Sequence, residues 1–149
     1  MTETIPNDLN RSTDSTCDKP VLTGISTPRI HTPLNDLPSR GGELIDLASS
    51  LKIDLMDWQK FALINTHKIK PDGRWASPIN CIVVARQNGK SFLQQIRILG
   101  GLFLWEEPLQ IGSAHRLATS LEQFRALISL IEANDSLANS SRVSGAQTK

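Results

Sequence analysis

The hydrophobic residues of this chain change their spacing along its length, and the first regular stretch has the spacing of helices. Between residues 41 and 51 the apolar positions follow the pattern of one helix face, at Leu44, Leu47, Ala48 and Leu51. A second helix is expected to start near Asp54 or Asp57, either of which can cap it, and to end near His67. This part of the chain therefore predicts a pair of helices.

The second half of the chain alternates between short β-branched runs and longer stretches of helical period. The order of these elements predicts an α/β fold that opens with a strand–helix–strand unit. Two neighbouring glycines inside the longest apolar helix predict close packing of another element against it. In chain order we expect a turn at 71–73 between short strands at 68–70 and 74–76, a buried strand at 78–85, a helix at 92–105, a strand at 109–114 and a helix at 117–131.

The ends of the chain differ in composition from its middle. Five of the eight prolines lie in residues 1–40, among many serines, threonines and asparagines, so this segment has too little apolar surface to offset its ordering entropy. The chain becomes polar again after residue 133. We therefore expect a flexible arm at 1–40, a folded unit at 41–133 and a disordered tail at 134–149.

Composition narrows the class of protein further. The chain has 149 residues, which is room for one domain, and a formal net charge of +1, which gives no strong overall field for nucleic acid. Two cysteines do not make a disulfide scaffold. No apolar run reaches the roughly 18 residues of a membrane span, and no signal peptide is recognisable at the start. The expected compartment is the reducing cytoplasm.

The strongest chemical signal is the polar segment Arg86-Gln87-Asn88-Gly89-Lys90-Ser91 between an expected strand and an expected helix. A loop at such a junction can direct backbone N–H groups at a polyphosphate, while a lysine reaches the phosphates and a hydroxyl contacts Mg²⁺. The usual phosphate-loop pattern has an additional glycine at the position of Val84. On the residues alone, an incidental loop with a solvated lysine remains the alternative.

The segment Ala85–Ser91 resembles the deviant Walker A motif of the large terminase subunit of tailed bacteriophages, a family that typically lacks the first glycine. Three other segments are similar to that family in the same order, and the similarity extends from about residue 28 to residue 131. They are Asp57-Trp58-Gln59, Asp72-Gly73-Arg74-Trp75 and Ser113-Ala114-His115-Arg116.

The resemblance implies a motor that uses ATP to drive double-stranded DNA into a procapsid, together with a small terminase subunit and a portal protein, in the host bacterial cytoplasm. It implies an incomplete P-loop NTPase sheet with flanking helices. Arg86 and Lys90 would be the catalytic cations, and Ser91 would ligate Mg²⁺. The nucleotide-binding residues would be Gln59, as an adenine contact, and Arg86, Gln87, Asn88, Gly89, Lys90 and Ser91.

Hydrolysis also requires an acidic pair at the end of a later strand. Glu106 and Glu107 are acidic but follow the helix that starts near Lys90, so they are expected at its far end, roughly 24 Å along the axis from Lys90. The chain is therefore interpreted as the N-terminal part of the ATPase, able to bind nucleotide without turnover and, with strand edges unpaired, prone to aggregate. The alternatives are a fragment of another P-loop or helicase-like NTPase, and a remnant that no longer binds nucleotide.

Overall fold

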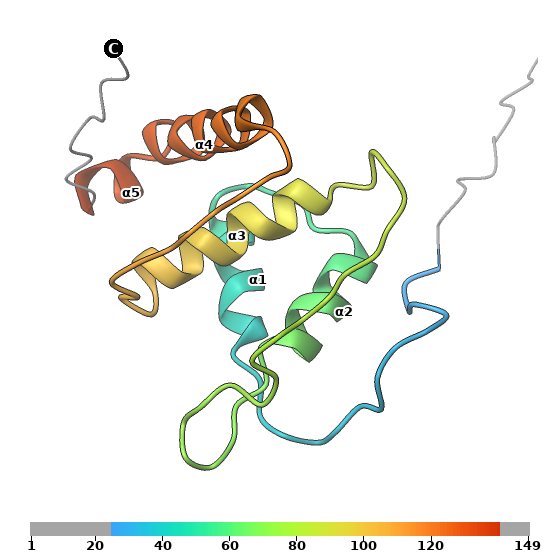
Figure 1. Ribbon diagram of the computed structural model, residues 1–149. Helices are drawn as coiled ribbons and strands as arrows, with labels where there is room; N and C mark the ends of the chain where they lie inside the picture. The colour runs from blue at the N-terminus through green and yellow to red at the C-terminus, as the bar shows by residue number, and fades with distance from the viewer. Residues whose placement is uncertain (1–24, 141–149) are drawn as a thin grey trace, which may run out of the picture.

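The computed structural model describes residues 25–140, and in this range the regular structure is helical. The first three helices pack together, and α4 and α5 lie next to α3 on one side of the molecule (Figure 1). The helices are α1 (Gly41–Ser50), α2 (Asp57–Thr66), α3 (Lys90–Phe103), α4 (Leu117–Glu132) and α5 (Asp135–Ser140).

The expected α/β fold is wrong for the described part of the chain. Segments 78–85 and 109–114 are extended, but no backbone hydrogen bond joins either of them to another segment within residues 25–140. A strand is stable only beside another strand, and the neighbour that would satisfy these backbone groups is not supplied by the described residues. The expectation of an incomplete P-loop NTPase sheet is therefore wrong. The described residues form a helical unit with two extended segments that pair with no strand.

The helices expected from hydrophobic period are confirmed, with shifts of a few residues at their ends. The cap expected for α2 is wrong, because the helix begins at Asp57 after Met56, and Asp54 takes no part. The backbone N–H of Met56 instead donates to the Gln59 side chain at 2.8 Å. A glutamine at the third helical position thus satisfies a backbone donor at the start of the helix, as in half of a capping box.

The expected short strands around the turn at 71–73 are reduced to isolated contacts. Single antiparallel bridges join Ser39 to Lys68 and Ile69 to Trp75. The Lys70 N–H donates to the Arg74 carbonyl at 2.8 Å, which closes the turn. The bridge at Ser39 joins the segment before α1 to the segment that follows α2.

The core lies where α1, α2 and α3 meet. Its largest fully buried side chains are Leu44 of α1, Leu63 of α2, and Ile96 and Leu99 of α3. Each comes from the apolar stripe of an amphipathic helix, so burial of these stripes is the main source of stability. The core positions α3, and therefore the loop that immediately precedes it.

The close packing expected at the paired glycines is confirmed at Gly100. A Cβ atom at this position would overlap a Leu44 methyl group, so α1 approaches α3 only because the side chain is missing. Gly41 is in the same situation against the Leu63 carbonyl of α2. Helix α1 is thus held between α2 and α3 by contacts that require glycine on each side.

The ends of the described range behave differently from each other. Residues 25–36 are exposed and without regular structure, whereas 37–40 are half-buried apart from Pro38, which is exposed. Helix α5 falls within the segment expected to be a disordered tail, and its Leu137 packs with Leu127 and Ile131 of α4. Residues 1–24 of the expected arm and 141–149 of the expected tail lie outside the described residues.

Replacement of Gly100 by alanine tests the helix contact. Gly100→Ala is expected to lower the free energy of unfolding by about 1–3 kcal/mol, since the added methyl group overpacks the core against Leu44. Gly42→Ala is the matched control, because nothing lies within 4 Å of its Cβ position. Urea denaturation followed by circular dichroism measures both, and equal stability of the two variants would contradict the packing described here.

The unpaired segment 78–85 is expected to associate with other copies or surfaces at high concentration. It carries no charge, and Ile79 and Val83 are 85% and 92% exposed. Apolar extended edges of this kind are aggregation-prone, and a lysine on them opposes pairing. Val83→Lys should shift the protein toward monomer in light scattering after gel filtration, whereas Ser129→Lys on the exposed side of α4 should not. Similar association in both variants would show that segment 78–85 does not cause the association.

Candidate phosphate-binding loop

The segment 86–91 forms a turn that ends in the first residues of α3. Gln87 and Gly89 both have left-handed backbone conformations, with φ of 64° and 73°. Gly89 is the N-cap of α3, where glycine adopts this conformation without steric cost, and Lys90 is the first residue of the helix. Turns with such backbone angles form concave arrangements of N–H groups that can bind anions.

The backbone donors of this loop are free to bind a ligand. Within residues 25–140, none of the N–H groups of residues 86–91 donates to another group of the chain; the first one engaged is that of Phe92, which donates to the Gly89 carbonyl at 3.1 Å. The open N–H groups at the start of a helix carry partial positive charge. The loop and the N-terminus of α3 therefore form one electropositive backbone site.

The side chains add positive charge to this site. Arg86, Lys90 and Ser91 are exposed, as are Gln87 and Asn88. Neither Arg86 nor Lys90 takes part in an ion pair with any carboxylate of the described residues. Two cations without anionic partners therefore flank the free backbone donors, an arrangement suited to a phosphate group.

Gln59 is brought to the loop across a sequence separation of thirty residues, but in a different role from the one expected. Its Nε2 donates to the Gly89 carbonyl at 2.9 Å, and its Oε1 accepts the Met56 N–H at 2.8 Å. The side chain is only 3% exposed. Both polar atoms of the amide thus form hydrogen bonds with backbone groups, and Gln59 links the start of α2 to the loop.

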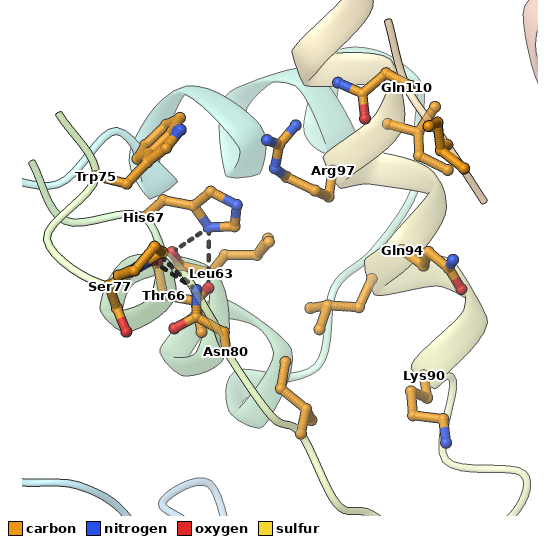
Figure 2. Close-up of a pocket in the computed structure, with 15 residues that line it drawn as sticks. Leu63, Thr66, His67, Trp75, Ser77, Asn80, Lys90, Gln94, Arg97 and Gln110 are labelled. Atoms are coloured by element: carbon orange, nitrogen blue, oxygen red, sulfur yellow. Dashed lines mark hydrogen bonds between the residues drawn. The ribbon is translucent and has the colours of Figure 1, made fainter. Parts of the chain in front are cut away.

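A cavity of about 710 Å³ extends along α3 from the loop, between segments 78–82 and 110–111. Lys90 lies at one end of it, and Arg97 lies two turns further along the same helix, facing His67 and Trp75 (Figure 2). Asn80 closes one wall by donating to the Thr66 carbonyl at 3.4 Å. The cavity is therefore positively charged at both ends, although one of these charges is compensated.

The compensated charge is that of Arg97, which sequence reasoning did not identify. Its guanidinium forms a two-pronged pair with Glu107, at 3.0 and 2.9 Å, and lies 4.8 Å from the centre of the Trp105 ring. Trp105 contacts Trp75 and His67, and its indole N–H donates to Glu43 at 2.6 Å. No periodic or spacing signal could have found this cluster, because its members come from α1, from α3 and from the two segments that connect α2 to α3 and α3 to α4.

Burial is the main cause that lowers the pKa of His67 below its ordinary value of 6.5, and the nearby positive charge of Arg97 lowers it further. A hydrogen bond between Nδ1 and the Leu63 carbonyl, at 2.9 Å, opposes this effect. His67 is therefore neutral at neutral pH and completes an aromatic stack. Its ring packs edge-on against Trp75 with centroids 5.6 Å apart.

Of the two acidic residues considered for hydrolysis, Glu107 has a structural role after the end of α3, whereas Glu106 is exposed. Helix α3 ends at Phe103, and Glu107 both holds Arg97 and accepts a hydrogen bond from Gln110. Among the residues that the structure describes, no three His, Cys, Asp or Glu side chains form a group that could hold a metal ion. In the same range no helix has the length and apolar character needed to cross a membrane.

Comparison of the chain with family models, with curated proteins and with solved structures finds no match. The likeness to the terminase large subunit therefore depends on the motif residues and their order. The structure brings Gln59 into contact with the loop, but the expected sheet around them is not formed by the described residues.

The lowered pKa of His67 predicts a loss of stability in mild acid. The unfolded chain binds a proton near pH 6.5 and the folded chain only at lower pH, so the stability present above that value falls as the pH drops toward the folded-state pKa. Melting temperatures between pH 7.5 and 5 measure the effect. His67→Gln should weaken this dependence, whereas His115→Gln, which removes an exposed imidazole, should preserve it. An unchanged dependence in His67→Gln would refute the assignment.

Proposed function

We propose that the loop 86–91 and the start of α3 bind the phosphates of ATP. The observation that carries this proposal is the coincidence of six free backbone N–H groups with two unpaired cations, Arg86 and Lys90, at a helix N-terminus. Phosphate binding in proteins uses this combination of helix dipole, backbone donors and cationic side chains.

Mg²⁺ fits the proposal as a companion of the nucleotide. The Ser91 hydroxyl is exposed and hydrogen-bonds to no other group of the described chain, so it is free to serve as one oxygen ligand. Mg²⁺ in nucleotide sites takes most of its remaining ligands from phosphates and water, so one protein oxygen suffices. When bound, the ion would neutralise phosphate charge next to Ser91.

The broader role we propose is that of the ATP-binding part of a phage DNA-packaging motor. This proposal rests on the resemblance of residues 85–91 to the terminase motif and on the order of the other similar segments along the chain. The partners would be double-stranded DNA, the small terminase subunit and the portal protein. The described residues support binding of nucleotide, and Glu107 is committed to Arg97, so we propose binding without hydrolysis by this unit.

Removal of the lysine ammonium tests nucleotide binding. Lys90→Ala is expected to weaken ATP–Mg²⁺ binding at least tenfold in calorimetric titration, because a charge-assisted contact contributes about 1.5–3 kcal/mol. Lys70→Ala removes an exposed lysine from the turn near Trp75 and should bind as the unaltered protein does. Circular dichroism of both variants checks that the helices remain.

The same titration separates the proposal from the alternative of an inactive remnant. A remnant would show no heat of binding in any variant at millimolar nucleotide. Equal affinity of Lys90→Ala and the unaltered protein for ATP–Mg²⁺ would show that Lys90 does not contact the nucleotide, and the proposed site would be wrong.

A further inference from the structure

The hydrogen bond from Gln59 to the Gly89 carbonyl determines the direction of the Lys90 N–H, the first N–H group of α3. Because a peptide bond is planar and trans, the Gly89 carbonyl and the Lys90 N–H point in opposite directions. The carbonyl is held on the inner side by the Gln59 amide at 2.9 Å and by the Phe92 N–H at 3.1 Å. The Lys90 N–H is therefore directed away from the helix, toward the open side of the loop.

The position of Gln59 is itself fixed. The side chain is 3% exposed, and its oxygen accepts the Met56 N–H at the start of α2. A Cβ atom at Gly89 would lie 2.8 Å from Nε2, so the glycine permits both the left-handed turn and the approach of the amide. One buried amide thus connects the N-terminus of α2 to the N-terminus of α3.

From this geometry we infer that Gln59 is a positioning residue that sets the affinity of the loop for phosphate, whatever base the phosphates carry. The inference rests on the proposed phosphate site and assigns Gln59 a role that differs from adenine recognition. Because the side chain is only 3% exposed and each polar atom of the amide already bonds to backbone, we expect no contact between this side chain and the base. Loss of its donor leaves the Gly89 carbonyl with one of its two hydrogen bonds, that from the Phe92 N–H, and so loosens the orientation of the Lys90 N–H.

Gln59→Glu replaces the Nε2 donor by an oxygen at nearly constant size. At pH 7.5 the variant is expected to bind ATP–Mg²⁺, GTP–Mg²⁺ and tripolyphosphate–Mg²⁺ about tenfold more weakly than the unaltered protein. An oxygen then replaces the Nε2 donor and leaves the Gly89 carbonyl with the Phe92 N–H alone. Ser129→Glu, which adds the same charge at an exposed position of α4, is the control for charge. At pH 5.5 the introduced carboxyl group can donate again once it is protonated, so the deficit of Gln59→Glu relative to the unaltered protein should narrow.

Each result of this experiment decides between roles. A loss confined to ATP, with tripolyphosphate unaffected, would show that Gln59 reads adenine and overturn the inference. Equal losses in Gln59→Glu and Ser129→Glu would assign the effect to added negative charge and would overturn the inference. No loss in Gln59→Glu would show that the loop keeps its conformation without the amide, which would overturn the inference as well. A loss common to all three ligands that narrows in acid supports it.

Hydrogen exchange without any ligand keeps the inference separate from the proposed function. The amide of Phe92, whose N–H donates to the Gly89 carbonyl, should exchange faster in Gln59→Glu than in the unaltered protein, while amides in the middle of α3 keep their protection. If the unaltered protein binds none of the three ligands, the proposed function fails. The exchange measurement still tests whether Gln59 positions the loop, and unchanged exchange of the Phe92 amide would refute that role.

Discussion

The arrangement of this molecule depends on how α3 is fixed at both of its ends. Near its C-terminus the missing side chain of Gly100 lets Leu44 of α1 pack directly against the helix backbone. At its N-terminus the buried amide of Gln59 holds the Gly89 carbonyl. A helix restrained in this way cannot slide or rotate without losing a close contact or a buried hydrogen bond, so the loop before it has a fixed position.

The second set of contacts surrounds the cavity beside α3. Arg97, Glu107 and the two indoles of Trp75 and Trp105 enclose His67 in a cluster where charge, ring stacking and burial act together. The half-buried Arg97–Glu107 pair is two-pronged, which gives it more geometric definition than an exposed pair. This cluster joins the turn at 71–73 and the segment after α3 to the helical core, and it leaves Lys90 as the uncompensated cation of the cavity.

Much of the helical structure could be predicted because it depends on local patterns. Leu44 and Leu99 lie on apolar stripes that are buried by whatever packs against them, and the paired glycines correctly indicated a close contact. The strands expected at 78–85 and 109–114 are wrong. The β-branched residues of 78–85 give only a preference for extended backbone, and both segments are extended without joining a sheet. Sheet formation needs a neighbouring strand, and local sequence does not say whether one is present.

For the candidate site, the sequence by itself determined which groups are available: the left-handed glycine, the two cations and the hydroxyl of Ser91, all within six residues of one another. Their proximity follows from chain connectivity, so no knowledge of the fold was needed. Only the tertiary structure decided the role of Gln59 and the membership of the cluster around His67. These depend on contacts between residues up to 62 positions apart, such as Glu43 with Trp105, and such contacts are set by packing of the helices as a whole.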